Sequence, residues 1–403
     1  MSAAAGSTDS IHLPRGFSFS AVAAGIKASG RLDLALAEAA PGTTAAAMFT
    51  KNRVVAAPVE IGRKHLRATG AHVHAVIVNS GNANCATGKA GIKDCLQVCQ
   101  KASGLLGFKA ELVFPSSTGI IGVPMPVSKI LAALPALVAA REASEHAVMQ
   151  FAHAIMTTDT RPKLASTQFQ VGRKNVNVLG VAKGSGMIHP QLATMLVYLL
   201  TDVAAAPTEL KRSLQAACNE TFKCISVDGD TSTNDTVLLM ASGPSEVHLG
   251  AVKNKFQDAL RQVCGSLAEK IVSDGEGVHH LIRLSVEQAR SHDEALRLAR
   301  SVARSLLVKT AWAGADPNWG RILAAIGASG VPIDPKKITI FIGRQMVCRN
   351  GAASRFDEAQ AHAELARPSA DVRIILHRGR ASAVFLTTDL TAEYVRINAD
   401  YST

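Results

Sequence analysis

The chain has 403 residues, of which 47% are hydrophobic and 19% are charged, a composition typical of a globular protein with a large core. Its net charge of +11 is compatible with nucleic acid, a membrane surface or an acidic substrate as partner. The basic residues are scattered, however, and lack interleaved aromatic side chains, which disfavours nucleic acid. Length alone suggests about two or three domains.

Cysteine usage and the apolar runs indicate the compartment. The seven cysteines are an odd number without a C-x-x-C pair, which favours a reducing, intracellular environment. The segment Met1–Ser10 has neither the positive region nor the apolar core of a secretory signal. The longest apolar run, 192–206, is interrupted by Thr201 and Asp202 and is too short to cross a bilayer. We therefore expect a cytoplasmic protein.

The first predicted elements alternate between strands and polar turns. A β-branched run at 73–78 predicts a strand, followed by a polar, glycine-punctuated turn at 79–88 and a helix that continues through Cys99. A second strand is expected at 112–114, followed by a tight turn at 115–122. Thr118-Gly119 by itself therefore predicts a turn.

The most informative stretch runs from Lys183 to Leu200. A glycine-rich loop leads into the apolar run 195–200, which predicts a buried strand, and Thr194 lies at the junction. No residue next to it in sequence is an evident base. If the Ala193–Thr194 bond were cut, the new α-amine, with a pKa of about 8, would be the base for its own hydroxyl. We therefore interpret Thr194 as the nucleophile of a self-cleaving enzyme, with Ala193-Thr194 as the cleavage site.

The second half continues with alternating strands and helices. A capping box at Ser291-x-x-Glu294 opens a helix whose buried face is expected to carry Ala295, Ala299, Val302 and Leu306. Upstream we expect a helix through Leu210, Leu214 and Ala217, a strand at 237–240 and a long helix, and downstream strands at 338–342, 372–376 and 383–386. This pattern predicts an α/β or α+β sandwich with a smaller C-terminal α/β unit at about 330–403.

Three motifs partly match known binding sites, for phosphate, calcium and other metal ions, but each lacks a required residue. The loop Gly184-Ser-Gly186 is not a P-loop, because Lys183 precedes the glycines instead of ending the loop. The segment 228–239 lacks the glycine and glutamate of a calcium loop, so a polar turn is favoured. The histidine pairs at 72/74 and 279/280 lack a third ligand. No metal site is expected.

Two further segments allow either a structural or a functional interpretation. The turn at Thr118-Gly119 can present an N–H and a hydroxyl to a developing oxyanion, as acyl transfer requires. Glu276 lies between two glycines and cannot be a helix-face charge, which leaves a solvated turn or a carboxylate that binds an amine.

Taken together, the motifs closely resemble the ornithine acetyltransferase family, also called bifunctional glutamate N-acetyltransferases. The resemblance covers nearly the whole chain. The segments that carry it are Gly16-Phe17, 24–27, 79–84, 117–119, 156–160, 183–187, 193–196, 228–235, 275–277, 316–321 and 394–403.

The resemblance implies a layered α-β-β-α-type sandwich of the self-processing type and a precursor that cuts itself into an α chain, 1–193, and a β chain, 194–403, two of each assembling. It implies that Thr194 takes acetyl from N-acetylornithine and passes it to glutamate in arginine biosynthesis, without cofactor or metal, with acetyl-CoA as a further donor in some members. It also implies that Thr118 and Gly119 form the oxyanion hole. The implied substrate-binding residues are Thr157, Lys183, Thr194, Glu276, Asn398 and Thr403.

Charge chemistry adds that Lys183 would pair with a substrate carboxylate and Glu276 with an ammonium group. The chain departs from the family pattern at Val278-His279-His280, directly after the Glu276 turn. Two rival hypotheses stay open from the sequence. One is an amidohydrolase or aminopeptidase on the same self-processing scaffold, and the other is a basic binding protein without chemistry.

Overall fold

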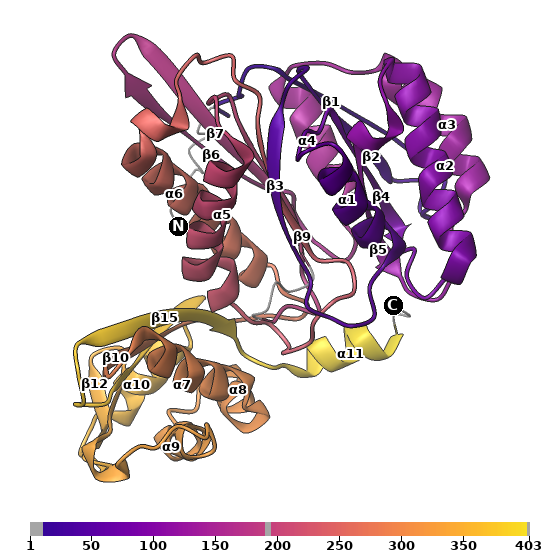
Figure 1. The fold of residues 1–403 in the computed structure, drawn as a ribbon. Helices are drawn as coiled ribbons and strands as arrows, with labels where there is room; N and C mark the ends of the chain where they lie inside the picture. The colour runs from indigo at the N-terminus through magenta and orange to yellow at the C-terminus, as the bar shows by residue number, and fades with distance from the viewer. Residues whose placement is uncertain (1–10, 190–194, 401–403) are drawn as a thin grey trace, which may run out of the picture.

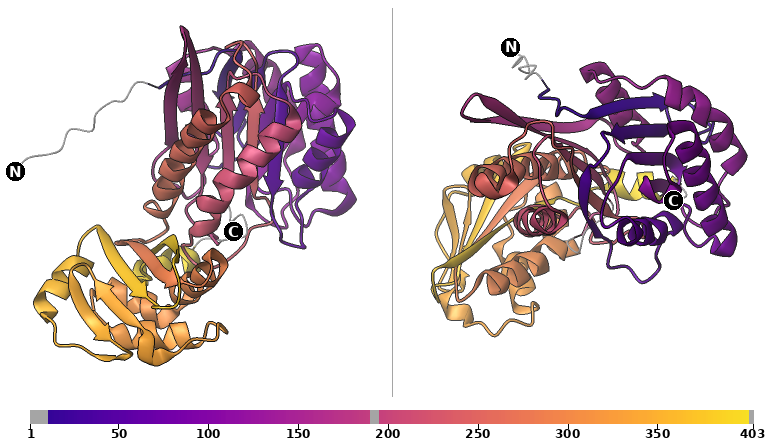
Figure 2. Two further views of the ribbon diagram at one scale, coloured as in Figure 1. Left: turned by 60° about the vertical axis from the view of Figure 1, so that its left-hand side comes forward. Right: turned by 45° about the horizontal axis from the view of Figure 1, so that its top comes forward.

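The computed structural model describes residues 11–189 and 195–400. Two sheets stack face to face, helices cover their outer faces, and a third sheet with helices of its own lies to one side (Figure 1 and Figure 2). The expected mixed α/β class and layered sandwich are confirmed. Within the described ranges, no helix combines the length and apolarity needed to cross a membrane.

The two stacked sheets each mix parallel and antiparallel neighbours. The first has the order β1-β2-β4-β5, made of β1 (Phe17–Val22), β2 (Leu34–Ala39), β4 (Ala75–Asn82) and β5 (Val113–Ile120). The second has the order β3-β9-β8-β7-β6, made of β3 (Thr44–Phe49), β9 (Thr236–Ala241), β8 (Leu196–Thr201), β7 (Lys174–Lys183) and β6 (Lys163–Val171).

Strand β8 shows how the sequence specifies the layers. Leu196, Tyr198 and Leu200 belong to the core between the two sheets, whereas Val197 and Leu199 belong to the core under the helices of the second sheet. Because side chains alternate across a strand, a continuously apolar run buries both faces. The strand predicted at 195–200 is thus confirmed as an internal strand.

In the described part of the chain, six helices flank the sandwich. They are α1 (Ala57–Ala68), α2 (Gly88–Leu106), α3 (Val127–Ala139), α4 (Glu145–Ala154), α5 (Pro207–Glu220) and α6 (Lys253–Val272). Helices α2 and α3 share a core with the first sheet, and α5 and α6 share one with the second. Helix α4 contributes to the core between the sheets. The result is the α-β-β-α layering seen in Figure 1.

The third sheet has the order β13-β12-β11-β14-β10-β15. Its strands are β10 (Leu281–Ala289), β11 (Thr339–Ile342), β12 (Gln345–Arg349), β13 (Ala352–Ala353), β14 (Ser369–Ile375) and β15 (Ala381–Thr388). Its helices are α7 (His292–Arg304), α8 (Leu306–Ala313), α9 (Trp319–Gly327) and α10 (Glu358–Leu365). Since β10 pairs with both β14 and β15, this unit starts at Leu281, well before the expected boundary near 330.

The last helix, α11 (Ala392–Asp400), leaves the third sheet and returns to the sandwich, as Figure 1 and the left view of Figure 2 show. It approaches the turn that carries Glu276. The C-terminal unit therefore contributes to a site that the sandwich mostly builds.

Two segments predicted as turns belong to strands. Thr118 and Gly119 continue strand β5 instead of forming a turn, because their backbones pair in parallel with Ser80 and Gly81. Pro115 does not prevent this, since β5 is an edge strand and needs no hydrogen-bond donor on its open side. The polar segment predicted as a turn from Asn79 likewise begins inside β4.

Leu306 does not share the buried face of α7. Helix α7 is capped by Ser291, as expected, but it ends at Arg304. Ser305 then accepts a hydrogen bond from the amide of Val308 and opens helix α8, so the periodicity breaks. The Leu306 side chain is exposed as a result.

Candidate active site

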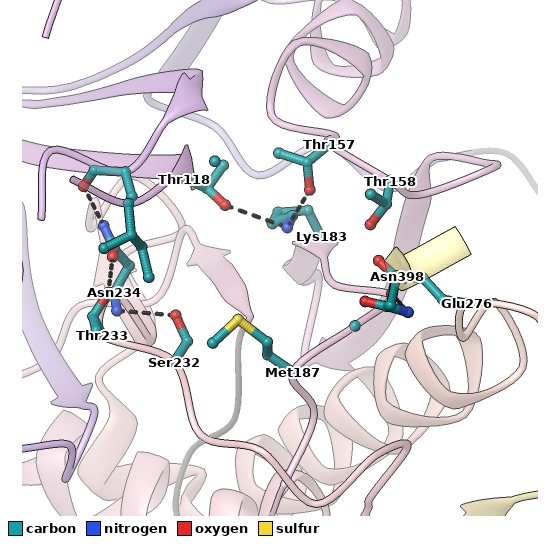
Figure 3. Close-up of a pocket in the computed structure, with 14 residues that line it drawn as sticks. Thr118, Thr157, Thr158, Lys183, Met187, Ser232, Thr233, Asn234, Glu276 and Asn398 are labelled. Carbon is teal, nitrogen blue, oxygen red and sulfur yellow. Dashed lines mark hydrogen bonds between the residues drawn. The ribbon is translucent and has the colours of Figure 1, made fainter. Parts of the chain in front are cut away.

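Six of the candidate site residues line one cavity in the described part of the chain: Thr118, Gly119, Thr157, Lys183, Glu276 and Asn398. In Figure 3, the five that are labelled, all but Gly119, converge from β5, the loop after α4, the end of β7, the loop after α6, and α11. Ala193, Thr194 and Thr403, the remaining candidates, lie outside the described residues.

Lys183 is the charged centre of this cavity. Its side chain is buried, and its Nζ donates hydrogen bonds to Thr157 Oγ1 at 2.8 Å and to Thr118 Oγ1 at 3.3 Å. Burial lowers the pKa of Lys183, and the carboxylate of Asp159, 3.8 Å away, opposes that shift. The ammonium thus lies among two threonine hydroxyls and one carboxylate.

The hydroxyl of Thr118 is oriented by this contact. Because Lys183 occupies an acceptor position on Oγ1, the hydroxyl hydrogen remains to be donated elsewhere. Gly119 follows with a φ of +132°, and a Cβ at this position would overlap the backbone of Gly81 in β4. Only glycine allows the two parallel strand ends to lie so close together.

An amide network explains the motif at 79–84. Asn79 Nδ2 donates to the carbonyl of Asn82 at 2.8 Å, and Asn79 Oδ1 accepts from Ser117 Oγ at 2.5 Å. From the other sheet, Asn234 Nδ2 donates to the carbonyls of Ala83 at 2.7 Å and Ser117 at 2.8 Å. These bonds join the ends of β4 and β5 to the turn before β9, and so fix the wall of the cavity.

Glu276 lies on the opposite side of the cavity from Thr118 in Figure 3. It is 8% exposed, its amide donates to the carbonyl of Ser185, and its Oε2 accepts from Asn398 Nδ2 at 2.9 Å. A Cβ at Gly186 would lie 2.5 Å from that same Oε2. The carboxylate therefore occupies space that only a glycine at 186 leaves open.

Two aspartates lie at the ends of the polar turn 227–236, the half-buried Asp228 and the buried Asp235. Asp235 is 1% exposed, its Oδ1 accepts the amide of Met195 at 3.2 Å, and within the described ranges its Oδ2 has no hydrogen-bond partner. Burial raises the pKa of Asp235 well above its ordinary value. The amide that follows Thr194 in sequence is thus held by a buried carboxyl group.

Asp228, at the other end, accepts the amides of Met187 and Asp230. Burial raises its pKa to about 6, against the effect of those two hydrogen bonds. The polar turn predicted here is confirmed, since Asp228 and Ser232 bond the backbone of residues two positions on.

Several cavity residues and the groups behind them were not predicted from the sequence. Thr158, Gly186, Met187 and the segment 232–234 also line the cavity. Asp159, Lys163 and Asp274 form a buried charged cluster behind Lys183. Within the described ranges, no group of three His, Cys, Asp or Glu side chains is placed to hold a metal ion.

Comparison with known families assigns the chain. A model of the ArgJ family matches residues 18–403. The chain belongs to the ArgJ family. The resemblance to ornithine acetyltransferases drawn from the motifs is thereby confirmed.

Members of the ArgJ family match over almost their full length. "Arginine biosynthesis bifunctional protein ArgJ" of Methylococcus capsulatus is 45% identical over 96% of this chain and 95% of the relative. The protein of the same name from Pseudomonas fluorescens is 40% identical over 100% of both chains. A solved structure, ornithine acetyltransferase from Mycobacterium tuberculosis complexed with ornithine, is 36% identical, covers 45% of this chain and 94% of that chain, and has a TM-score of 0.39.

Proposed function

We propose that this protein transfers acetyl from N-acetylornithine to glutamate through an acetyl-threonine intermediate on Thr194. Membership of the ArgJ family makes it an acetyltransferase of arginine biosynthesis, and the alternative of an amidohydrolase or aminopeptidase is not favoured. The observation that best supports the detailed proposal is the cavity that gathers Lys183, Glu276 and Thr118. It holds a cation, an anion and a hydroxyl donor, the complement of an N-acyl diamino acid.

The two charged residues bind opposite ends of the substrate. The ammonium of Lys183 receives the α-carboxylate, with the hydroxyl of Thr157 beside it. The carboxylate of Glu276, steadied by Asn398, receives the side-chain ammonium of the donor. Thr403 is proposed to complete the binding site. A substrate held at both ends has its acetyl group positioned for attack.

In the first half-reaction, the Thr194 hydroxyl attacks the acetyl carbonyl carbon while its proton passes to the free α-amine of the same residue. The Thr118 hydroxyl and the Gly119 amide stabilise the oxyanion. The carbon–nitrogen bond then breaks, the proton moves to the leaving nitrogen, and ornithine departs. In the second half-reaction the amine of glutamate attacks the acetyl ester, which releases N-acetylglutamate and regenerates the hydroxyl. Both steps proceed without a cofactor.

The free α-amine requires a cut before Thr194, so the proposal includes self-cleavage into chains 1–193 and 194–403, with two of each in the assembly. Asp235 supports this step, because its carboxyl group holds the amide of Met195 at the start of β8. A buried carboxyl there limits the freedom of the chain just after the scissile bond. The proposed compartment is the cytoplasm.

The decisive assay compares release of ornithine from N-acetylornithine with and without glutamate. The proposal predicts sustained release only when glutamate is present, with one N-acetylglutamate formed for each ornithine. Release at the same rate without an acceptor would instead assign a hydrolase. Replacing N-acetylornithine by acetyl-CoA in the same assay tests whether the acetyl-threonine can also be formed from a thioester.

A further inference from the structure

Lys163 is a fully buried lysine in β6 that bridges two carboxylates. Its side chain is 1% exposed, and its Nζ lies 2.6 Å from Asp159 Oδ1 and 2.5 Å from Asp274 Oδ2. The two carboxylates come from different segments, the loop after α4 and the loop after α6. A buried ammonium is costly unless it is paired and hydrogen-bonded, so this arrangement calls for a function.

Asp159 organises one side of the cavity. Its Oδ1 accepts the amide of Gly184 at 2.6 Å, and its Oδ2 accepts the amide of Thr157 at 3.0 Å. The same Oδ2 lies 3.8 Å from the Nζ of Lys183. One carboxylate thus fixes the backbone at Thr157 and directly after Lys183, the two residues that we assign to the substrate carboxylate.

Asp274 organises the other side. Its Oδ2 accepts the amide of Thr160 at 3.1 Å, and its carbonyl accepts the hydroxyl of Ser185 at 2.6 Å. The carbonyl of Ser185 in turn accepts the amide of Glu276 at 3.1 Å. Because Lys163 joins Asp159 to Asp274, it connects the half of the cavity around Lys183 with the half around Glu276.

The members of the cluster also shift one another's pKa values. Burial alone would raise the pKa of Asp159, but Lys183 and Lys163 outweigh it and lower the pKa to about 2. Burial lowers the pKa of Lys183, Asp159 raises it, and Lys163 lowers it. The charged groups that face Lys183 are Asp159, Lys163, Glu276, Asp235 and, from the loop between β1 and β2, Lys27.

We infer that Lys163 is a positioning residue for the transferase site, which holds the two halves of the cavity together and competes with Lys183 for Asp159. This inference rests on the proposed function for its kinetic readout only. With Lys163 in place, Asp159 makes its short contact with Lys163 and a longer one with Lys183. Lys183 therefore keeps its hydrogen bonds to Thr157 and Thr118 and remains directed into the cavity.

The test uses three variants at this position and a control. Lys163→Met leaves two buried carboxylates facing each other, so the double variant Lys163→Met/Asp274→Asn, which removes one charge of each sign, is the informative one. Lys163→Arg keeps the cation. Lys174→Met is the matched control, because Lys174 forms an exposed ion pair on β7, away from the cavity.

The first readout is the titration of Lys183, followed by NMR of protein labelled with ¹³C at the lysine ε-carbon and assigned by its loss in Lys183→Arg. In the double variant, Asp159 loses its contact with Lys163 and keeps its contact with Lys183, so the midpoint of the Lys183 titration should rise by about one pH unit or more. The pH limb of kcat/KM that belongs to Lys183 should move in the same direction. KM for N-acetylornithine should rise about 10-fold, and by more than kcat falls, as loss of substrate positioning predicts.

Lys163→Arg and Lys174→Met should titrate like the wild type. A folded double variant with an unshifted Lys183 midpoint and a wild-type KM would overturn the inference, since Lys163 would then only fill its site. Failure of all three Lys163 variants to fold, with Lys174→Met intact, would overturn it as well. The NMR titration needs no turnover, so absence of acetyl transfer in the wild type would refute the proposed function and leave this test standing.

Discussion

Gly186→Ala is expected to damage donor binding without damaging the fold. A Cβ at this position would lie 2.5 Å from Glu276 Oε2, whereas a carbon–oxygen contact normally needs roughly 3.3–3.6 Å. The φ of Gly186 is outside the left-handed region, so alanine fits the backbone. The carboxylate must therefore retreat by about 1 Å, away from its hydrogen bond to Asn398.

The size of the effect follows from the contact that is lost. A hydrogen bond to a charged group contributes about 1.5–3 kcal/mol, which corresponds to a factor of about 10–100 in kcat/KM for N-acetylornithine. The assay measures ornithine release at varied donor concentration and saturating glutamate. The control is Gly104→Ala in α2, where nothing lies within 4 Å, so the rate should not change and the helix should gain roughly 0.5–1 kcal/mol. A Gly186→Ala enzyme with wild-type kcat/KM would refute the placement of Glu276 at the donor ammonium.

Three further predictions follow from other groups. Thr118→Ala should slow acetylation of the enzyme by about 10-fold or more, as loss of one oxyanion donor does, and rapid-quench trapping of the acetyl-enzyme measures it; an unchanged rate removes Thr118 from the oxyanion hole. The folded-state pKa of Asp228 is raised to about 6, so its contribution to the free energy of unfolding falls as pH rises from about 4 to 6. Relative to the wild type, the free energy of unfolding of Asp228→Asn in urea should therefore increase by up to about 3 kcal/mol between pH 4 and pH 7. Parallel pH profiles for the two proteins would contradict this. A tag added after Thr403 should raise KM for the donor with little change in kcat, and equal Michaelis constants with and without the tag would argue against a role of that residue in binding.

Periodicity was sufficient where an element buries a regular face. The run 195–200 and the helix opened by Ser291 were predictable, because alternation and capping are encoded within a few residues. The continuation of β5 through Thr118 and Gly119 was not, because it depends on pairing with β4, a partner distant in sequence. The position of β10 between β14 and β15 was not predictable either, because it also depends on pairing with strands that are distant in sequence.

Some residues of the candidate site could likewise be predicted from local sequence, and others could not. The glycine-flanked Glu276 and the loop after Lys183 carry local signals of an unusual backbone. Lys163 carries none, since a lysine in a polar strand normally faces solvent, and its partner Asp274 is far away along the chain. The prediction that Asn398 binds substrate came from the family resemblance only, because nothing in α11 itself indicates that the helix returns to the sandwich.

The central claim is that the chain acquires its catalytic base by breaking the bond before Thr194, and the intact mass of the purified protein tests it most directly. Two chains are expected, 1–193 and 194–403, whose masses sum to that of the 42.2 kDa precursor plus one water. A single uncut and inactive chain is expected for Thr194→Ala. A fully active wild-type preparation that contains only the uncut chain would contradict the account.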